Sequence, residues 1–361
     1  MMKGHMKKFH TFAIHAFLVL VGLTGCGHQP SDGGLDSGNA SGYEDKTVSA
    51  TFKVNDQRCG WIKDQVKPPL ALKWSYKTGK GIYSSPSMAM ETVYFGGEDG
   101  YLYAVSAETG RSKWKYKENG KIYGSSPAVA NGKVYISTTA GGLCCHDALT
   151  GARLWNFIAN SRTPAFSSPL VQDGLVFFGA DNGCFYALDA STGKSRWKYS
   201  TKNKIHDNSA AYDQGLVFFG SQDGSIYAVH AATGKLTWKF KTPSPINTCP
   251  MIHNGYVYFG STNGTLYAVG EKDGRQAWTF KAGKGIGSSP AIDDKGRLVF
   301  GAADRNVYCL DAVSGKRMWT FKTEGYVFAS PLVAGPVVYV GSFDGKFYAT
   351  NYVPGSGITS I

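Results

Sequence analysis

Seven tryptophans recur at a nearly constant spacing along most of this sequence. Neighbouring members of the set lie 40 to 42 residues apart, at Trp74, Trp114, Trp155, Trp197, Trp238, Trp278 and Trp319. A period near 41 residues with several short strands in each unit is typical of a β-propeller, whose blades bury their faces against one another. The period therefore predicts an all-β ring of similar sheets.

One unit, residues 177–197, shows how a blade is built. It reads FFGADNGCFYALDASTGKSRW and contains a strand, an Asn-Gly turn, a second strand, a Thr-Gly turn and the strand that carries Trp197. Asn-Gly and Asp-Gly tolerate the positive φ angles of tight hairpin turns. An apolar strand beside a Ser-Ser-Pro sequence, such as the one at Ser167, precedes the unit and completes four strands. Where Asp304-Arg305 replaces Asp-Gly, we expect a strained or altered turn.

The two ends of the repeat indicate how the ring closes. Seven first strands are present, and the last third strand, at residues 346–350, has no tryptophan strand after it. The first tryptophan strand, at residues 70–77, has no strands of its own before it. We therefore predict a seven-bladed β-propeller of four-stranded antiparallel blades over residues 70–361, closed by this N-terminal strand. Eight blades are the alternative if residues 46–56 pair with residues 352–361, although neither segment carries the repeat.

The N-terminus is read as a targeting segment and set apart from the fold. Three lysines precede an apolar run at residues 12–22, and Leu23-Thr24-Gly25-Cys26 follows. This sequence resembles the lipobox of bacterial lipoproteins, which implies cleavage before Cys26 and a lipid on its thiol. Residues 1–25 are then a signal peptide, residues 26–45 a lipidated flexible tether and residues 46–69 an N-terminal extension. An ordinary secretory signal with a chance cysteine is the alternative.

The repeat resembles that of the quinoprotein-like propellers, whose pattern is A-x-D-x-x-T-G-K-x-x-W. Residues 187–197 match this pattern at every fixed position. In that family the tryptophan docks between neighbouring blades, so the seven tryptophans are expected to be structural.

Lipobox, tether and repeat together are similar to the BamB family of outer-membrane β-barrel assembly lipoproteins. The resemblance implies a non-catalytic scaffold without a cofactor, lipid-anchored on the periplasmic face of the outer membrane. Its expected partners are the barrel-assembly protein and its clients, which it would bind as a monomer within a larger complex.

The loops that lead into the first strands carry positive charge. The formal net charge is +12, and a cation stands six or seven residues before the proline position of the Ser-Ser-Pro sequence, at Lys80, Lys121, Arg162, Lys204 and Lys284. First strands line the channel of a propeller, so these side chains would surround one mouth, with His206 and Asp207 in the irregular loop beside Lys204. We expect an electropositive funnel that captures an acidic partner segment or an anionic ligand. Solvated loop lysines without a partner are the alternative.

A second set of cations alternates with aromatic residues on the tryptophan strands, as in Lys113-Trp114-Lys115-Tyr116. These strands are outermost in a propeller blade, where lysine opposes edge-to-edge pairing. We therefore expect no nucleic-acid partner.

Catalytic chemistry has little support in the sequence. Cys144 and Cys145 fall in a third strand, where consecutive side chains point to opposite faces and do not suit a vicinal bridge above a quinone. No CxxC spacing or accompanying histidine cluster is present, so no metal site is expected. His206-Asp207 has no obvious nucleophile beside it. A quinone-dependent or sugar-acting propeller enzyme is one alternative function, and a surface lipoprotein that binds cell-envelope polymers is another.

Overall fold

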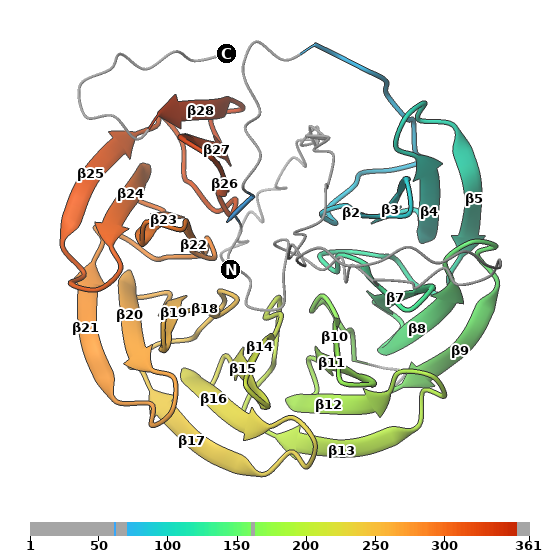
Figure 1. Cartoon of the computed structure of the whole chain (residues 1–361), viewed down its shortest axis with the longest axis horizontal. Coiled ribbons are helices and arrows are strands. Elements are labelled where there is room, and N and C mark those ends of the chain that lie inside the picture. The colour runs from blue at the N-terminus through green and yellow to red at the C-terminus, as the bar shows by residue number, and fades with distance from the viewer. Residues whose placement is uncertain (1–60, 63–70, 160–162, 352–361) are drawn as a thin grey trace, which may run out of the picture.

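Seven four-stranded sheets stand like blades around a central axis in the computed structural model (Figure 1), which describes residues 61–62, 71–159 and 163–351. The first three sheets are β2 (Ser87–Ala89), β3 (Thr92–Gly96), β4 (Tyr101–Ser106) and β5 (Ser112–Lys117); β6 (Ala128–Ala130), β7 (Lys133–Thr138), β8 (Gly142–Asp147) and β9 (Arg153–Ile158); and β10 (Leu170–Gln172), β11 (Leu175–Gly179), β12 (Cys184–Asp189) and β13 (Ser195–Ser200). The next three are β14 (Ala211–Asp213), β15 (Leu216–Gly220), β16 (Ser225–His230) and β17 (Leu236–Lys241); β18 (Met251–His253), β19 (Tyr256–Gly260), β20 (Thr265–Gly270) and β21 (Gln276–Lys281); and β22 (Ala291–Ile292), β23 (Arg297–Gly301), β24 (Asn306–Asp311) and β25 (Arg317–Lys322). The seventh sheet contains β1 (Trp61–Ile62), β26 (Leu332–Ala334), β27 (Val337–Gly341) and β28 (Phe347–Asn351). The predicted all-β propeller of seven sheets is confirmed.

Burial within a blade follows the position of the strand. In the second to sixth sheets, the second and third strands, such as β11 and β12, are buried on both faces because a neighbouring blade covers each face. The outer strand β13 alternates between exposed and half-buried side chains, which leaves its lysine and arginine in solvent. The aromatic and β-branched residues of the repeat thus form the layers of apolar core between blades.

Tryptophan side chains join neighbouring blades. Six of them donate an indole Nε1–H bond of 2.7 to 3.2 Å to a backbone carbonyl of the following blade. Each indole also covers the glycine of that blade's Thr-Gly type turn. A Cβ added at Gly193, for instance, would lie 2.6 Å from Cε3 of Trp155. These tryptophans therefore lie at the contacts between blades and away from the central channel.

Close to the channel, a chain of hydrogen bonds links the first strands. The backbone N–H of Ser85 donates to Oγ of Ser126 in the next blade, and five equivalent bonds continue this pattern as far as Ser330. Cys249 replaces serine once, and its Sγ accepts from Ser209 N–H at 3.3 Å. Within the described ranges, no equivalent bond leads from Ser330 back to Ser85. The second Ser of the Ser-Ser-Pro sequence therefore connects blades.

The N-terminal contribution to the seventh sheet differs from the prediction. β1 joins this sheet on its inner edge, parallel to β26, with Trp61 opposite Val333. Residues 71–78 form no strand, although Trp74 still docks on the first blade through a 3.0 Å bond to the Ala107 carbonyl. The expected outer strand at residues 70–77 is thus replaced by side-chain docking. Residues 46–56 and 352–361, the segments considered for an eighth blade, lie outside the described residues, as do the signal peptide and Cys26.

The turn at Asp304-Arg305 is strained, as predicted. Arg305 has a φ of +72°, whereas glycine takes this conformation in the equivalent turn at Gly224, with a φ of +80°. Left-handed backbone costs a residue with a Cβ roughly 1 kcal/mol or more. Among the described residues there is no helix long and apolar enough to cross a membrane.

Candidate functional site: the channel mouth

The loops that enter the blades all lie on one face of the ring. In each blade, the turn between the second and third strands donates a backbone N–H to a carbonyl of the entering loop, as Glu98 does to Gly81 and Gln222 to Lys204. Lys80, Lys121, Lys204 and Lys284 lie in equivalent loops, and all are exposed. Arg162, the fifth predicted cation, lies outside the described residues. The four cations therefore occur on the same face.

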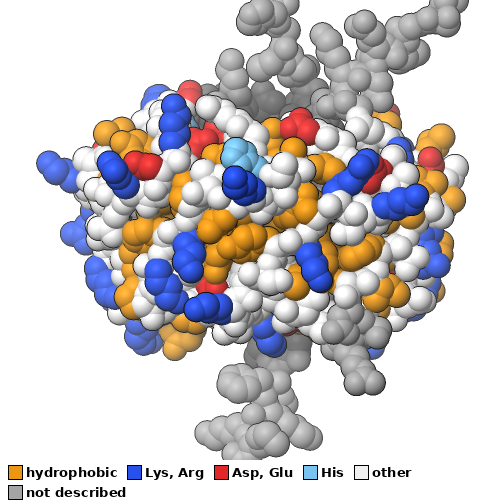
Figure 2. Space-filling view, turned by 90° about the horizontal axis from the view of Figure 1, so that it is seen from below, with side chains coloured by type: hydrophobic (Ala, Val, Ile, Leu, Met, Phe, Trp, Pro, Cys, Tyr) orange, Lys and Arg blue, Asp and Glu red, His pale blue; other side chains and the backbone are white. Residues whose placement is uncertain are grey.

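Carboxylates partner two of these cations. Lys121 Nζ lies 2.8 Å from Glu98 Oε1, and Lys204 Nζ lies 3.4 Å from Asp181 Oδ2. Lys284 Nζ lies 5.8 Å above the ring of Tyr326. In the rim view of Figure 2, lysine and arginine side chains are spread over the surface between apolar areas and do not form a single patch. The mouth thus carries charges of both signs.

His206 and Asp207 contact each other although they are consecutive. Asp207 has a φ of +52°, and this left-handed conformation brings its Oδ2 to 3.5 Å from His206 Nε2. His206 Nδ1 also lies 2.8 Å from Asp181 Oδ1 in the preceding blade, and this hydrogen bond raises the histidine pKa. Burial raises the pKa of Asp207. The three residues form a polar bridge between the third and fourth blades.

A row of aromatic rings follows the same loops, and sequence reasoning missed it. It consists of Tyr83, Tyr123, Phe166 and His206, with ring centroids 4.4, 6.0 and 4.6 Å apart in that order. Each ring follows the apolar residue of its loop, as in Ile82-Tyr83 and Ala165-Phe166. This repeated pair of an apolar residue and a ring was the sequence feature that could have predicted the row. We call these four residues the aromatic row.

Further rings are exposed at the seventh blade, on the same face. Phe328 contacts Tyr326 and Phe343, with centroids 6.1 and 5.4 Å away. Phe328 is 40% exposed and Phe343 64%. Large apolar side chains gathered at one opening are unusual for a surface without a partner. This face is therefore the strongest candidate for an interaction site.

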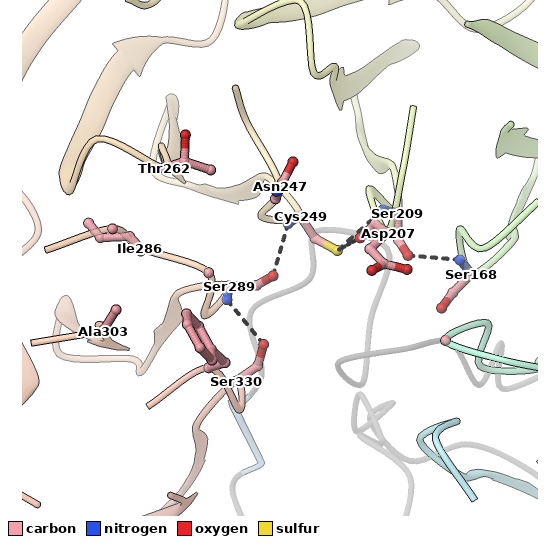
Figure 3. Close-up of a pocket in the computed structure, with 14 residues that line it drawn as sticks. Ser168, Asp207, Ser209, Asn247, Cys249, Thr262, Ile286, Ser289, Ala303 and Ser330 are labelled. Carbon is pink, nitrogen blue, oxygen red and sulfur yellow. Dashed lines mark hydrogen bonds between the residues drawn. The ribbon is translucent and has the colours of Figure 1, made fainter. Parts of the chain in front are cut away.

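Between the aromatic row and Phe328 the channel widens into a cavity of about 570 Å³, which we call the channel pocket (Figure 3). Asn247 and Gly287 stand where other loops carry aromatic rings, and the Phe328 ring packs directly against Gly287, which has no side chain. Figure 3 shows Asp207 and Asn247 on either side of Cys249, with serine hydroxyls of the inner hydrogen-bond chain around them. The lining combines hydroxyl, amide and carboxylate groups with apolar surface, and Asp207 is the one charged residue among the described residues that line it.

The vicinal cysteines lie far from any such opening, inside the second blade. Cys144 packs into the core between the first and second blades, and Cys145 into the core between the second and third. Burial raises the pKa of Cys145 to about 12. No three His, Cys, Asp or Glu side chains within the described ranges are grouped so that they could hold a metal ion. The buried pair Cys144 and Cys145 and the scattered carboxylates of the described residues do not fit a calcium-bound quinone site.

Comparison with protein families identifies the repeat. Four overlapping matches to the family described as "Outer membrane protein assembly factor BamB" cover residues 67–156, 120–206, 200–285 and 262–356. The chain belongs to this family. No curated protein matches the sequence.

Solved structures share the fold of this BamB-family chain. BamB from Moraxella catarrhalis is 21% identical over 80% of this chain and 88% of its own, with a TM-score of 0.65. The quinohemoprotein alcohol dehydrogenase ADHIIG from Pseudomonas putida HK5 is 18% identical over 83% of this chain and 70% of its own, with a TM-score of 0.73. A europium-containing methanol dehydrogenase, at 16% identity, covers 85% of this chain and 84% of its own, also with a TM-score of 0.73. At these identities the structures show the propeller fold and leave the activity open.

Proposed function

We propose that this BamB-family propeller is a non-catalytic scaffold that binds protein partners during assembly of outer-membrane proteins. The observation that carries the proposal is the concentration of exposed and half-buried aromatic rings on the face that bears the blade-entry loops. Aromatic side chains provide large contact areas at low entropic cost and are enriched at protein interfaces. The family description, an outer-membrane protein assembly factor, indicates the process in which these partners would take part.

A lipid on Cys26 would hold the scaffold at the periplasmic face of the outer membrane. The tether of residues 26–45 would then let the mouth reach partners beside the membrane. In this scheme the loop cations Lys80, Lys121, Lys204 and Lys284 act at the border of the interface, where charge steers association more than it adds affinity. Cys26→Ala should move the protein from the membrane fraction to the soluble fraction of fractionated cells.

The dehydrogenases that share the fold do not favour a second proposal of quinone chemistry. In the described part of the chain, the pocket offers a single carboxylate, and both members of the cysteine pair are buried in blade cores. A calcium site requires six to eight oxygen ligands, usually from several carboxylates.

Site-specific photocrosslinking in the native cell envelope tests the scaffold proposal. A photoreactive amino acid at Tyr123 or Phe343 samples the mouth, and one at Leu154 serves as a matched control because it is an exposed apolar position on outer strand β9. We expect outer-membrane assembly proteins to be captured from Tyr123 and Phe343 but not from Leu154. Equal capture from all three positions, or capture of no envelope protein from the mouth, would contradict the proposal.

A further inference from the structure

We propose that the channel pocket is a binding site for a basic side chain, in particular the guanidinium group of an arginine on the bound partner. This inference rests on the proposed function for the source of the arginine, while the chemistry of the pocket is independent of it. Its basis is a set of polar and aromatic side chains that line one cavity.

Asp207 is the first of these side chains. Among the described residues that line the pocket it is the one with a charge, and its side chain is 50% exposed. Across the described residues its carboxylate accepts no hydrogen bond, and its nearest opposite charge is His206 Nε2 at 3.5 Å. His206 is shared with Asp181, whose Oδ1 is nearer, at 2.8 Å from the other ring nitrogen. Asp207 therefore retains most of its capacity to bind a cation.

Asn247 supplies the second acceptor. Its Oδ1 is buried and has no hydrogen-bond partner in the part of the chain that the structure describes. A buried acceptor without a donor is unfavourable, and native proteins nearly always satisfy such atoms. Asn247 lines the same cavity as Asp207, so rotation of its amide toward the cavity would let a ligand with several N–H donors satisfy both residues.

An aromatic surface lies at the same cavity. The Phe328 ring is 40% exposed and stands over Gly287, so that a Cβ added at Gly287 would lie 2.7 Å from Phe328 Cδ1. An arginine guanidinium is planar, carries five N–H donors and stacks on aromatic faces. The Asp207 carboxylate, the Asn247 amide and the Phe328 ring thus match the charge, the N–H donors and the flat face of a guanidinium group.

Other ligand classes fit less well. An anionic ligand would face the Asp207 carboxylate, and the nearby cations Lys121 and Lys204 already have the carboxylate partners Glu98 and Asp181. The acidic segment that the loop cations alone indicate is therefore disfavoured inside the pocket. A divalent metal ion would need more carboxylates than the single one that lines the cavity.

Binding of small arginine analogues to the purified full-length protein tests this inference. The probe is Nα-acetyl-arginine amide, and Nα-acetyl-citrulline amide is its neutral control of nearly the same shape. Ligand-observed NMR detects the weak binding expected of one side chain. We expect the arginine probe alone to bind.

Two matched variants test whether the Asp207 charge binds the arginine probe. Asp207→Asn should weaken binding of the arginine probe at least tenfold, because a charge-assisted hydrogen bond is lost. Asp173→Asn should bind as wild type, since Asp173 has a nearly identical φ of +51° but lies in the β10–β11 turn, at the end of a first strand opposite to the blade-entry loops. Asparagine tolerates this backbone conformation, so both variants should fold.

Equal binding of the citrulline control, wild-type affinity in Asp207→Asn or failure of the arginine probe to bind would each overturn the inference. Crosslinks from Tyr123 that persist when the probe does not bind would leave the scaffold function standing and reject only the pocket ligand. Probe binding without crosslinked envelope proteins would support the pocket and reject the scaffold function.

Discussion

A buried carboxyl group between the fourth and fifth blades should make the stability of the propeller depend on pH. Glu271 follows strand β20, and its backbone carbonyl accepts the Trp238 indole bond at 2.7 Å. The equivalent carbonyl belongs to alanine in other blades, at Ala148 and Ala190 for example. Burial, together with the charge and hydrogen bond of Asp213, raises the pKa of Glu271 from 4.5 to about 7.

The sign of the effect follows from proton binding. Because the folded state holds the Glu271 proton more tightly than the unfolded state, the contribution of this group to the unfolding free energy is largest below pH 4.5. The contribution is lost as the pH rises to about 7, the pKa in the folded protein. Each unit of pKa shift corresponds to about 1.4 kcal/mol. Partial access of water reduces the total, so the loss should be about 1 to 3 kcal/mol.

Glu271→Gln removes the charge and keeps the shape of the side chain. We expect the melting temperature of this variant, measured by circular dichroism, to exceed that of wild type by a few degrees at pH 8 and by much less at pH 5. Glu108→Gln is the control, because the Glu108 side chain is 77% exposed, and it should follow the wild-type pH profile. A Glu271→Gln profile parallel to that of wild type between pH 5 and pH 8 would refute the argument.

The remaining predictions concern turns that build the blades. Arg305→Gly should raise the unfolding free energy by about 0.5 to 1 kcal/mol in urea titration, because glycine relieves the left-handed strain at a φ of +72°; an unchanged or lower midpoint would contradict this explanation. Gly193→Ala should destabilise the protein more than Gly174→Ala. Both glycines have a φ of +71°, but a Cβ at Gly193 meets the Trp155 ring whereas Gly174 has no atom within 4 Å. The difference between the two variants, about 1 to 3 kcal/mol, measures the overpacking of the blade contact alone; equal losses would show that backbone conformation accounts for both.

Sequence reasoning predicted the elements that the repeat carries. The tryptophan period, the Asn-Gly and Asp-Gly turns and the exception at Asp304-Arg305 each depend on local preferences, so one sequence was sufficient to place them. The aromatic row was missed because each loop contributes only one ring, and only the closed arrangement of blades brings Tyr123 to Phe166 and Phe166 to His206.

Contacts between loops could likewise not be predicted from the sequence. Lys121 pairs with Glu98 and Lys204 with Asp181 of the preceding blade, so the expected uniform positive charge is partly cancelled. The prediction of a strand at residues 70–77 was wrong for a similar reason. The aromatic pattern of these residues serves the docking of Trp74 on the first blade, and the ladder of the seventh sheet is instead extended by β1 on the inner edge.

The direction of the contacts between blades implies an order of assembly during synthesis. Six indoles bond to carbonyls 33 to 35 residues further along the chain, and the inner amides bond to partners 40 to 42 residues further on. Because the chain emerges N-terminus first, each blade receives its docking partner only when the following blade has been made. The pairing of β1 with β26 spans nearly the whole domain and carries the largest loop-closure cost. The propeller should therefore grow as a linear array of blades and become a ring only in its last folding step.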